Sequence, residues 1–171
     1  ENEKYIIAKE LVAKVMEMAG KPEYKIEKTF KGKELEGVLC NHPFLPRTSR
    51  VVIGSDDTVA VELETGTGAV HTAPGYGKED YLCGLKNGLE VVVTVDEKGH
   101  QTEGAGPFAG MFYAKSDKAI IEWLEEHGLL LHKQDLMHSY PHCWRCKKPV
   151  IYRATNQWFA SVDGFRKETL E

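Results

Sequence analysis

A histidine and an aspartate stand on either side of a glycine-rich turn, where both could lie beside a bound ligand. Residues 69–73 predict a short strand that ends at Pro74, because proline cannot continue a central strand. After the turn, apolar spacing predicts a helix with Asp80 in its first turn and Gly88 at its end. The chain therefore reverses between His71 and Asp80, and the sequence predicts that their side chains face one cleft.

Each of these two residues also has an ordinary structural explanation. Asp80 would stabilise a helix from its first turn, because a negative charge there complements the helix dipole. A single strand histidine is commonly a hydrogen-bonded structural residue. The glycine-dense strand–turn–helix setting favours a ligand site, because functional residues concentrate on loops held by a rigid scaffold. The stretch is neither a dinucleotide fingerprint nor a phosphate-binding loop, since His71 replaces the third glycine and the closing Gly-Lys-Ser/Thr is missing.

A second candidate site is the Cys-Trp-Arg-Cys sequence at Cys143 and Cys146, which has the spacing of a zinc knuckle. A structural zinc site needs four ligands, and the other two cysteines, Cys40 and Cys83, are isolated in the sequence. The pattern therefore predicts half of a zinc site. The alternative is a reduced pair of cysteines in a tight turn.

Composition excludes several classes of protein. The 171 residues suit one domain with a core, and 42% hydrophobic and 28% charged residues are ordinary for a soluble globular protein. No apolar run approaches the roughly 20 residues that span a bilayer. A net charge of −4 means that any nucleic-acid contact must use a local basic patch. Because it begins at Glu1 without a methionine, the chain is expected to be an excised piece of a larger protein.

The remaining elements are helices separated by many short strands. The first helix buries Leu11 and Val15 and ends at Gly20, and a later helix begins at the N-cap Ser116 and ends before Gly128. Strands are predicted at 24–30, 38–46, 51–53, 58–63, 91–95, 129–131 and 136–140. The pattern predicts a β-rich fold, a closed β-barrel with peripheral helices. The region is basic at Lys25, Lys28, Lys31 and Lys33. These lysines are expected to protect a solvated strand edge, and contact with nucleic acid is the alternative.

Residues 66–81, GTGAVHTAPGYGKEDY, resemble the hallmark of the editing domains of valyl-, leucyl- and isoleucyl-tRNA synthetases, which are class I enzymes. The His-Thr-Ala-Pro-Gly continuation is similar to the bacterial isoleucyl type. Tyr76 stands where a histidine is common in the family, and Asn156 stands where a proline is common. Further blocks carry the resemblance over almost the whole chain, at 42–44, 138–147 and 153–159.

The resemblance implies a barrel-like editing domain over residues 1–142, inserted into a larger catalytic fold. Residues 143–171 would form the knuckle and the segment that returns to the synthetic domain. The implied activity is that of an isoleucine–tRNA ligase that hydrolyses mischarged valine on tRNA(Ile), or valyl adenylate. One methylene in an apolar pocket is worth only about 1–3 kcal/mol, for which isoleucine against valine is the usual illustration, so a second site must remove valine.

The resemblance also implies roles for particular residues. Asp80 would pair with the α-ammonium group of the substrate, because a cation needs a partner when it leaves water. His71 would hydrogen-bond the ester or ribose hydroxyl, or orient the attacking water. The remaining substrate-binding residues are expected to be Gly68, Val70, Thr72, Ala73, Tyr76 and Gly77.

The family's cleft also uses an upstream threonine-rich strand, which nothing in this chain matches, so the chain alone is expected to lack part of the cleft. Editing needs no cofactor, and zinc is expected only in the full-length parent. The expected partners are the 3′ end of tRNA(Ile) carrying valine and the remaining synthetase domains, in the cytoplasm and without a membrane. Two alternatives remain: a fragment that binds tRNA without hydrolysis, and valyl-type editing of threonine.

Overall fold

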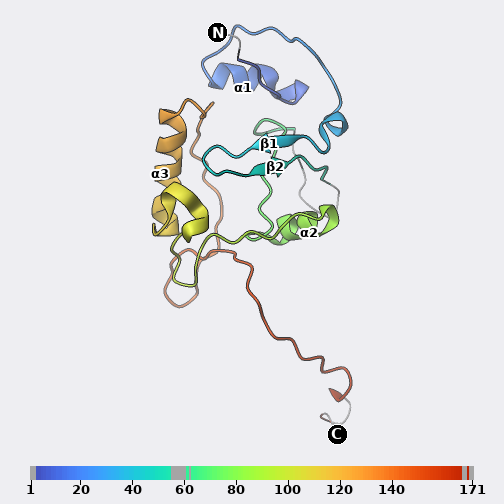
Figure 1. Cartoon of the computed structure of the whole chain (residues 1–171), viewed down its shortest axis with the longest axis vertical. Coiled ribbons are helices and arrows are strands. Elements are labelled where there is room, and N and C mark those ends of the chain that lie inside the picture. The colour runs from blue at the N-terminus through green and yellow to red at the C-terminus, as the bar shows by residue number, and fades with distance from the viewer. Residues whose placement is uncertain (1–2, 55–60, 62, 167–168, 170–171) are drawn as a thin grey trace.

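The computed structural model describes residues 3–54, 61, 63–166 and 169. The short β1–β2 hairpin lies between the helices, and the C-terminal segment extends away from the rest of the molecule (Figure 1). In the described chain, no helix has the length and apolar character that would be needed to cross a membrane. In chain order the elements are η1 (Lys9–Leu11), α1 (Val12–Met18), η2 (Gly32–Leu35), β1 (Leu39–Asn41), β2 (Thr48–Arg50), α2 (Lys78–Asn87), η3 (Glu103–Phe108) and α3 (Tyr113–Glu126).

The predicted closed β-barrel is not seen among the described residues. These residues form one antiparallel pair, β1 with β2, in which Cys40 lies opposite Ser49. More of them are helical than are in strands, so the structure is a mixed fold with a small open sheet rather than a clearly β-rich one. Most of the predicted strand at 58–63 lies outside the described residues. Of the strand predicted at 38–46, only Leu39–Asn41 is a strand. Other predicted strands are not strands in the structure, namely those at 24–30, 51–53, 69–73, 91–95, 129–131 and 136–140.

Residues 91–95 show why an apolar, β-branched run did not become a ladder strand. The Tyr76 hydroxyl accepts hydrogen bonds from the backbone amides of Thr94 and Val95, at 2.8 and 2.9 Å. The carbonyl oxygen of Val95 accepts a bond from Nε of Arg153 at 2.7 Å. Side chains therefore occupy some of the backbone groups that a neighbouring strand would otherwise use. Backbone pairing is limited to an isolated bridge between Val95 and Gln101.

The N-terminal helix packs against the start of the 66–81 stretch. Its predicted apolar face is confirmed for Leu11 and Val15, which are buried. Before the helix, the Ala8 amide donates to the carbonyl oxygen of Thr67 at 2.8 Å. A Cβ at Gly68, whose φ is +83°, would lie 2.4 Å from the Cβ of Ala8. Only glycine allows this close approach and this φ together.

Helix α2 has the predicted bounds, from Lys78 to a left-handed cap at Gly88 with φ +62°. Its buried residues are Cys83 and Gly84, and a Cβ at Gly84 would lie 2.7 Å from Cγ of Pro74. The helix thus packs directly on the end of the preceding turn. Its larger apolar side chains are exposed instead of facing a core, namely Tyr81, Leu82 and Leu85.

Helix α3 begins earlier than predicted. It starts at Tyr113, so Ser116 lies inside the first turn and is not the N-cap. The Ser116 hydroxyl donates to the Tyr113 carbonyl oxygen at 2.7 Å and accepts from Nε2 of Gln101 at 3.0 Å. A serine within the first turn can bond backward to the chain, which the sequence pattern did not distinguish from capping. The predicted end is confirmed by Gly128, with φ +66°.

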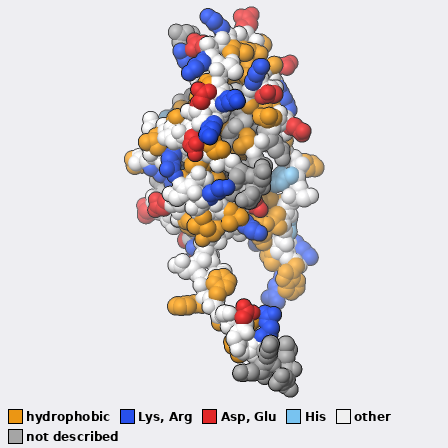
Figure 2. Space-filling view, turned by 90° about the vertical axis from the view of Figure 1, so that its right-hand side faces the viewer, with side chains coloured by type: hydrophobic (Ala, Val, Ile, Leu, Met, Phe, Trp, Pro, Cys, Tyr) orange, Lys and Arg blue, Asp and Glu red, His pale blue; other side chains and the backbone are white. Residues whose placement is uncertain are grey.

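The core is small, and large apolar side chains remain exposed on the projecting C-terminal part. Trp158 is 103% exposed and Phe159 is 90% exposed, and hydrophobic side chains stand out along this projection (Figure 2). The division into residues 1–142 and 143–171 stays a prediction. The buried apolar residues of the described chain are Leu11, Val15, Met16, Cys83, Val95, Ala105 and Phe108.

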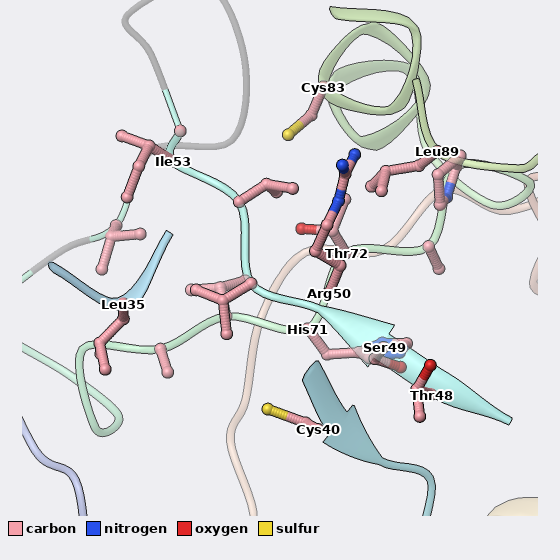
Figure 3. Close-up of a pocket in the computed structure, with 18 of the residues that line it drawn as sticks. Leu35, Cys40, Thr48, Ser49, Arg50, Ile53, His71, Thr72, Cys83 and Leu89 are labelled. Atoms are coloured by element: carbon pink, nitrogen blue, oxygen red, sulfur yellow. The ribbon is translucent and has the colours of Figure 1, made fainter. Parts of the chain in front are cut away.

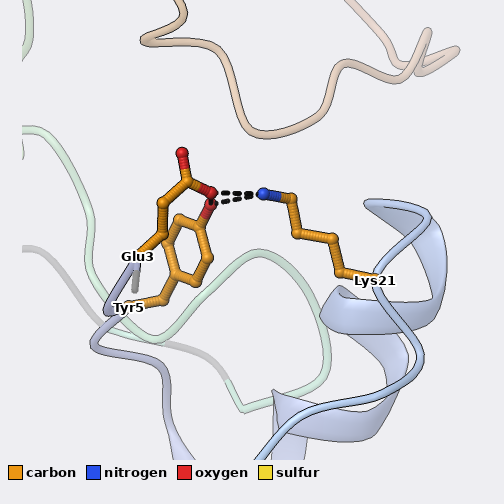
Figure 4. A network of polar contacts seen from close by, with 3 residues as sticks. All are labelled: Glu3, Tyr5 and Lys21. Carbon is orange, nitrogen blue, oxygen red and sulfur yellow. Dashed lines mark hydrogen bonds and ion pairs between the residues drawn. The ribbon is translucent and has the colours of Figure 1, made fainter. Parts of the chain in front are cut away.

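The N-terminal segment is tied to the end of α1 by a polar network (Figure 4). The Lys21 ammonium donates to the Glu3 carboxylate and, at 2.9 Å, to the Tyr5 hydroxyl. The hydrogen bond from Lys21, then that from Tyr5, lowers the pKa of Glu3 below its usual value. The hydrogen bond to Glu3 raises the pKa of Lys21.

We expect this network to give the chain a small acid-sensitive contribution to stability. A lowered Glu3 pKa stabilises the fold above the ordinary glutamate pKa, near 4.5, and the effect is lost as pH falls through the folded-state pKa. When the pH is lowered from 6 to 3, the melting temperature of Glu3→Gln should therefore fall less than that of the unmodified chain. Because the pair is exposed, the difference should be small and should shrink with added salt. If the melting temperatures of the two proteins fell by the same amount between pH 6 and pH 3, Glu3 would make no such contribution.

Candidate functional site

A cavity of about 1120 Å³ lies between the β1–β2 hairpin, the 66–81 stretch and α2 (Figure 3). In Figure 3, Thr48 and Ser49 belong to the β2 wall, and Cys83 marks the α2 wall. Two of the predicted site residues, Gly77 and Asp80, are not among the residues that line the cavity. The others do line it: Gly68, Val70, His71, Thr72, Ala73 and Tyr76.

The turn between the predicted strand and α2 is as sharp as the glycines indicated. The Tyr76 amide donates to the carbonyl oxygen of Ala73 at 2.9 Å and closes the turn. Gly75 is buried, and a Cβ there would lie 2.4 Å from the carbonyl oxygen of Val92. The turn is therefore pressed against residues 92–94, and glycine is required because no side chain fits at this point.

Asp80 anchors the turn from the helix side. Its Oδ2 accepts a hydrogen bond from the Ala73 amide at 3.1 Å, and its side chain is half-buried. No hydrogen bond to Oδ1 comes from the described residues, which leaves one carboxylate oxygen for another partner. Gly77 gives this carboxylate room, since a Cβ there would lie 3.3 Å from Oδ2. Asp80 is thus hydrogen-bonded to the wall residue Ala73, and its sharing of a cleft with His71 stays a prediction.

Tyr76 supports the cavity wall through its hydroxyl group. In addition to accepting the two amide bonds from Thr94 and Val95, this oxygen lies 3.1 Å from Oγ1 of Thr94. These partners use the capacity of the hydroxyl. Tyr76 therefore forms part of the cavity wall, but its hydroxyl group is already hydrogen-bonded to other groups of the protein.

We expect Tyr76→Phe to lower the free energy of unfolding by about 1–3 kcal/mol, because it leaves the amides of Thr94 and Val95 without their acceptor. Urea unfolding measures this change. Tyr81→Phe is the matched control, since Tyr81 is an exposed tyrosine on α2 whose hydroxyl makes no hydrogen bond to the described residues. Equal unfolding energies for the two variants would show that the Tyr76 hydroxyl carries no such role.

His71 lies on the cavity wall with its side chain exposed, and a second histidine lies near it. Nδ1 of His42 accepts amide hydrogen bonds from Phe44 at 3.3 Å and Leu45 at 3.2 Å. Burial lowers the pKa of His42, and the charges of Arg47 and His71 lower it further. The lowered pKa favours the neutral form of His42, which the hairpin holds within electrostatic reach of His71.

The two arginines of the cavity wall were not predicted from the sequence, and Lys33 was predicted as a strand-edge lysine with nucleic-acid contact as the alternative. Lys33, Arg47 and Arg50 line the cavity together with the hydroxyl side chains of Thr48 and Ser49. The Arg50 guanidinium extends from β2 toward α2 and donates to the carbonyl oxygen of Asn87 (Figure 3). The signal that could have found this group is the Arg-Thr-Ser-Arg run at 47–50, where two cations flank two hydroxyls next to a hairpin turn.

The cysteine pair forms the predicted tight turn. The Cys143 amide donates to the Lys148 carbonyl oxygen at 2.8 Å, and the Lys147 amide returns a bond to Cys143 at 2.9 Å. Backbone hydrogen bonds from Cys146 and then Arg145 lower the pKa of the Cys143 thiol. Both cysteines are free. In the part of the chain that the structure describes, no three His, Cys, Asp or Glu side chains are grouped to hold a metal. The half zinc site at Cys143 and Cys146 stays a prediction.

Comparisons with known proteins agree with the family resemblance of the sequence. No protein-family model matches the chain. The chain is 50% identical over 169 residues to isoleucine–tRNA ligase of Moorella thermoacetica and 52% identical over 170 residues to that of Caldicellulosiruptor bescii. It is also 50% identical over 170 residues to the isoleucine–tRNA ligase of Caldanaerobacter subterraneus subsp. tengcongensis. Each match covers 99% of this chain and 18% of the relative, so the chain spans less than a fifth of the enzymes that it matches.

Proposed function

We infer that this chain, which corresponds over nearly its whole length to one segment of the isoleucine–tRNA ligases, carries the hydrolytic editing site of such a ligase. The proposed substrate is valine esterified to tRNA(Ile), with valyl adenylate as a second substrate. The observation that supports this most is the cavity wall at His71, Thr72 and Ala73, with the Asp80 carboxylate hydrogen-bonded to the Ala73 amide.

The proposed reaction is hydrolysis of an ester. Water attacks the ester carbonyl carbon, the bond to the ribose oxygen breaks, and free valine and tRNA are released. Asp80 would hold the α-ammonium group through Oδ1, since Oδ2 is already bonded to Ala73. His71, on the cavity wall, would orient the water or donate a proton to the leaving ribose oxygen. An aminoacyl ester is already reactive, so positioning the water supplies much of the acceleration.

The small side chains of the wall support selection by size. Ala73 and Thr72 present little bulk to the cavity, and Gly75 cannot carry a side chain where the turn meets Val92. These residues leave room for the valine side chain beside the ester. Exclusion of the larger isoleucine side chain, which is the role of a second sieve, is part of the proposal. Tyr76 supports this wall by fixing Thr94 and Val95.

The further partners are also proposals. The 3′ end of tRNA(Ile) would enter the cavity, and the remaining domains of the ligase would contact the exposed C-terminal segment in the cytoplasm. Editing as proposed uses no cofactor. Cys143 and Cys146 would supply two thiolates to a structural zinc in the full-length protein, where the metal would stabilise the fold and take no part in hydrolysis.

The test is deacylation by the full-length ligase that contains this segment. We expect it to hydrolyse tRNA(Ile) carrying valine and to leave tRNA(Ile) carrying isoleucine intact. A tRNA(Val) carrying threonine is included, because preferential hydrolysis of this substrate would indicate valyl-type editing instead. Binding of mischarged tRNA without any hydrolysis would contradict the proposed activity and leave a tRNA-binding fragment.

A further inference from the structure

The charge of the cavity wall differs from that of the chain as a whole. The chain carries a net charge of −4, but the described wall holds three cations, Lys33, Arg47 and Arg50, against one carboxylate, Glu90. The cavity lining also contains His71 and small or hydroxyl side chains. Within the cavity, Arg50 lies near Thr72, and Ser49 of the same strand lies near His71 (Figure 3). Cationic side chains therefore line the same cavity as the proposed ester site.

Two of these cations are available to a ligand. The side chains of Lys33 and Arg47 are exposed at the cavity, and neither makes an ion pair within the described residues. Arg50 differs, because its guanidinium is held by the Asn87 carbonyl oxygen at the end of α2. One fixed and two free cations thus line one cavity, together with the hydroxyls of Thr48 and Ser49.

We propose that the wall formed by Lys33, Arg47 and Arg50 binds a phosphodiester group of the RNA 3′ end whose terminal ester reaches His71. This inference rests on the proposed function and names the residues that hold the nucleic-acid part of its substrate. Guanidinium groups match phosphate oxygens in charge and geometry, and adjacent hydroxyls donate to the same oxygens. The cavity, at about 1120 Å³, exceeds the roughly 300–1000 Å³ of small-molecule pockets, which suits an aminoacyl nucleoside together with a phosphate.

Two non-hydrolysable probes separate the phosphate from the aminoacyl end. The first is adenosine that carries valine through an amide at its 3′ position, and the second extends it by one 5′ cytidine and so adds one phosphodiester. Calorimetry with the full-length ligase gives both dissociation constants. The unmodified protein should bind the extended probe more tightly. Arg47→Ala should reduce this gain by about tenfold and leave the affinity for the shorter probe unchanged.

Lys33→Ala should also reduce the gain. In each variant, the slope of log K against log salt concentration for the extended probe should become shallower by up to about 0.7. Arg166→Ala is the matched control, because this exposed arginine lies on the C-terminal segment and not at the cavity. Arg50 is left intact because it also holds α2. The inference would be overturned if the added phosphodiester increased the affinity of both Arg47→Ala and Lys33→Ala as much as it does that of the unmodified protein. Failure of the shorter probe to bind at all would overturn the proposed editing site instead.

Discussion

Asp80→Ala in the full-length ligase is expected to reduce deacylation of valyl-tRNA(Ile) by about 10- to 100-fold, while isoleucine activation keeps its unmodified rate. A charge-assisted contact to the substrate ammonium is worth about 1.5–3 kcal/mol, which sets this range. The loss should be selective because editing and synthesis use different sites. Single-turnover deacylation and isoleucine-dependent pyrophosphate exchange measure the two activities on the same preparation.

Two further variants separate the charge of Asp80 from its structural contact. Asp80→Asn retains an oxygen that can accept from the Ala73 amide but removes the charge, so it should be as defective as Asp80→Ala. Glu79→Ala removes the neighbouring carboxylate of the same first helical turn and should deacylate normally. If Asp80→Asn deacylates normally while Asp80→Ala is inactive and melts at lower temperature, Asp80 serves only as the anchor of the turn.

His71→Ala is expected to reduce deacylation by about 100-fold, the lower end of the range for a positioned proton-transfer group. Because the side chain is exposed on the cavity wall, the free energy of unfolding should change by no more than about 0.5 kcal/mol. Deacylation rates and urea unfolding of the same variant measure both effects.

His132→Ala supplies the control for His71→Ala, since His132 is another exposed histidine and does not line the cavity. It should leave both deacylation and stability unchanged. A His71→Ala protein that deacylates at the unmodified rate would remove His71 from the mechanism. A variant that loses activity only because it unfolds would show His71 to be a structural residue.

Local signals predicted the region around the turn well. Pro74, the neighbouring glycines and Gly88 specify where the chain reverses and where α2 ends, and α2 has the expected bounds. These features depend on backbone angles and on contacts only a few residues apart. The anchoring bond from Ala73 to Asp80 spans seven residues, but it was not predicted, because a first-turn aspartate has several equivalent explanations.

Contacts between distant segments could not be predicted in the same way. An apolar, β-branched run such as 91–95 indicates an extended chain but does not identify its partners. Here these are the Tyr76 hydroxyl and, through an isolated bridge, Gln101. The arginines of the cavity wall, and the place of Lys33 beside them, were not predicted for a related reason. Arg47 and Arg50 reach the 66–81 stretch only because the hairpin places them there, and Lys33 comes from the separate turn η2.

The most direct measurement is a structure of the full-length ligase with the valyl-amide adenosine bound. The account predicts that the valine lies in the cavity beside His71, with its ammonium within hydrogen-bonding distance of Oδ1 of Asp80. The adenosine should extend from there toward the hairpin wall. A probe bound in another pocket, or an ammonium held by a group other than Asp80, would contradict the assignment of this cavity as the editing site.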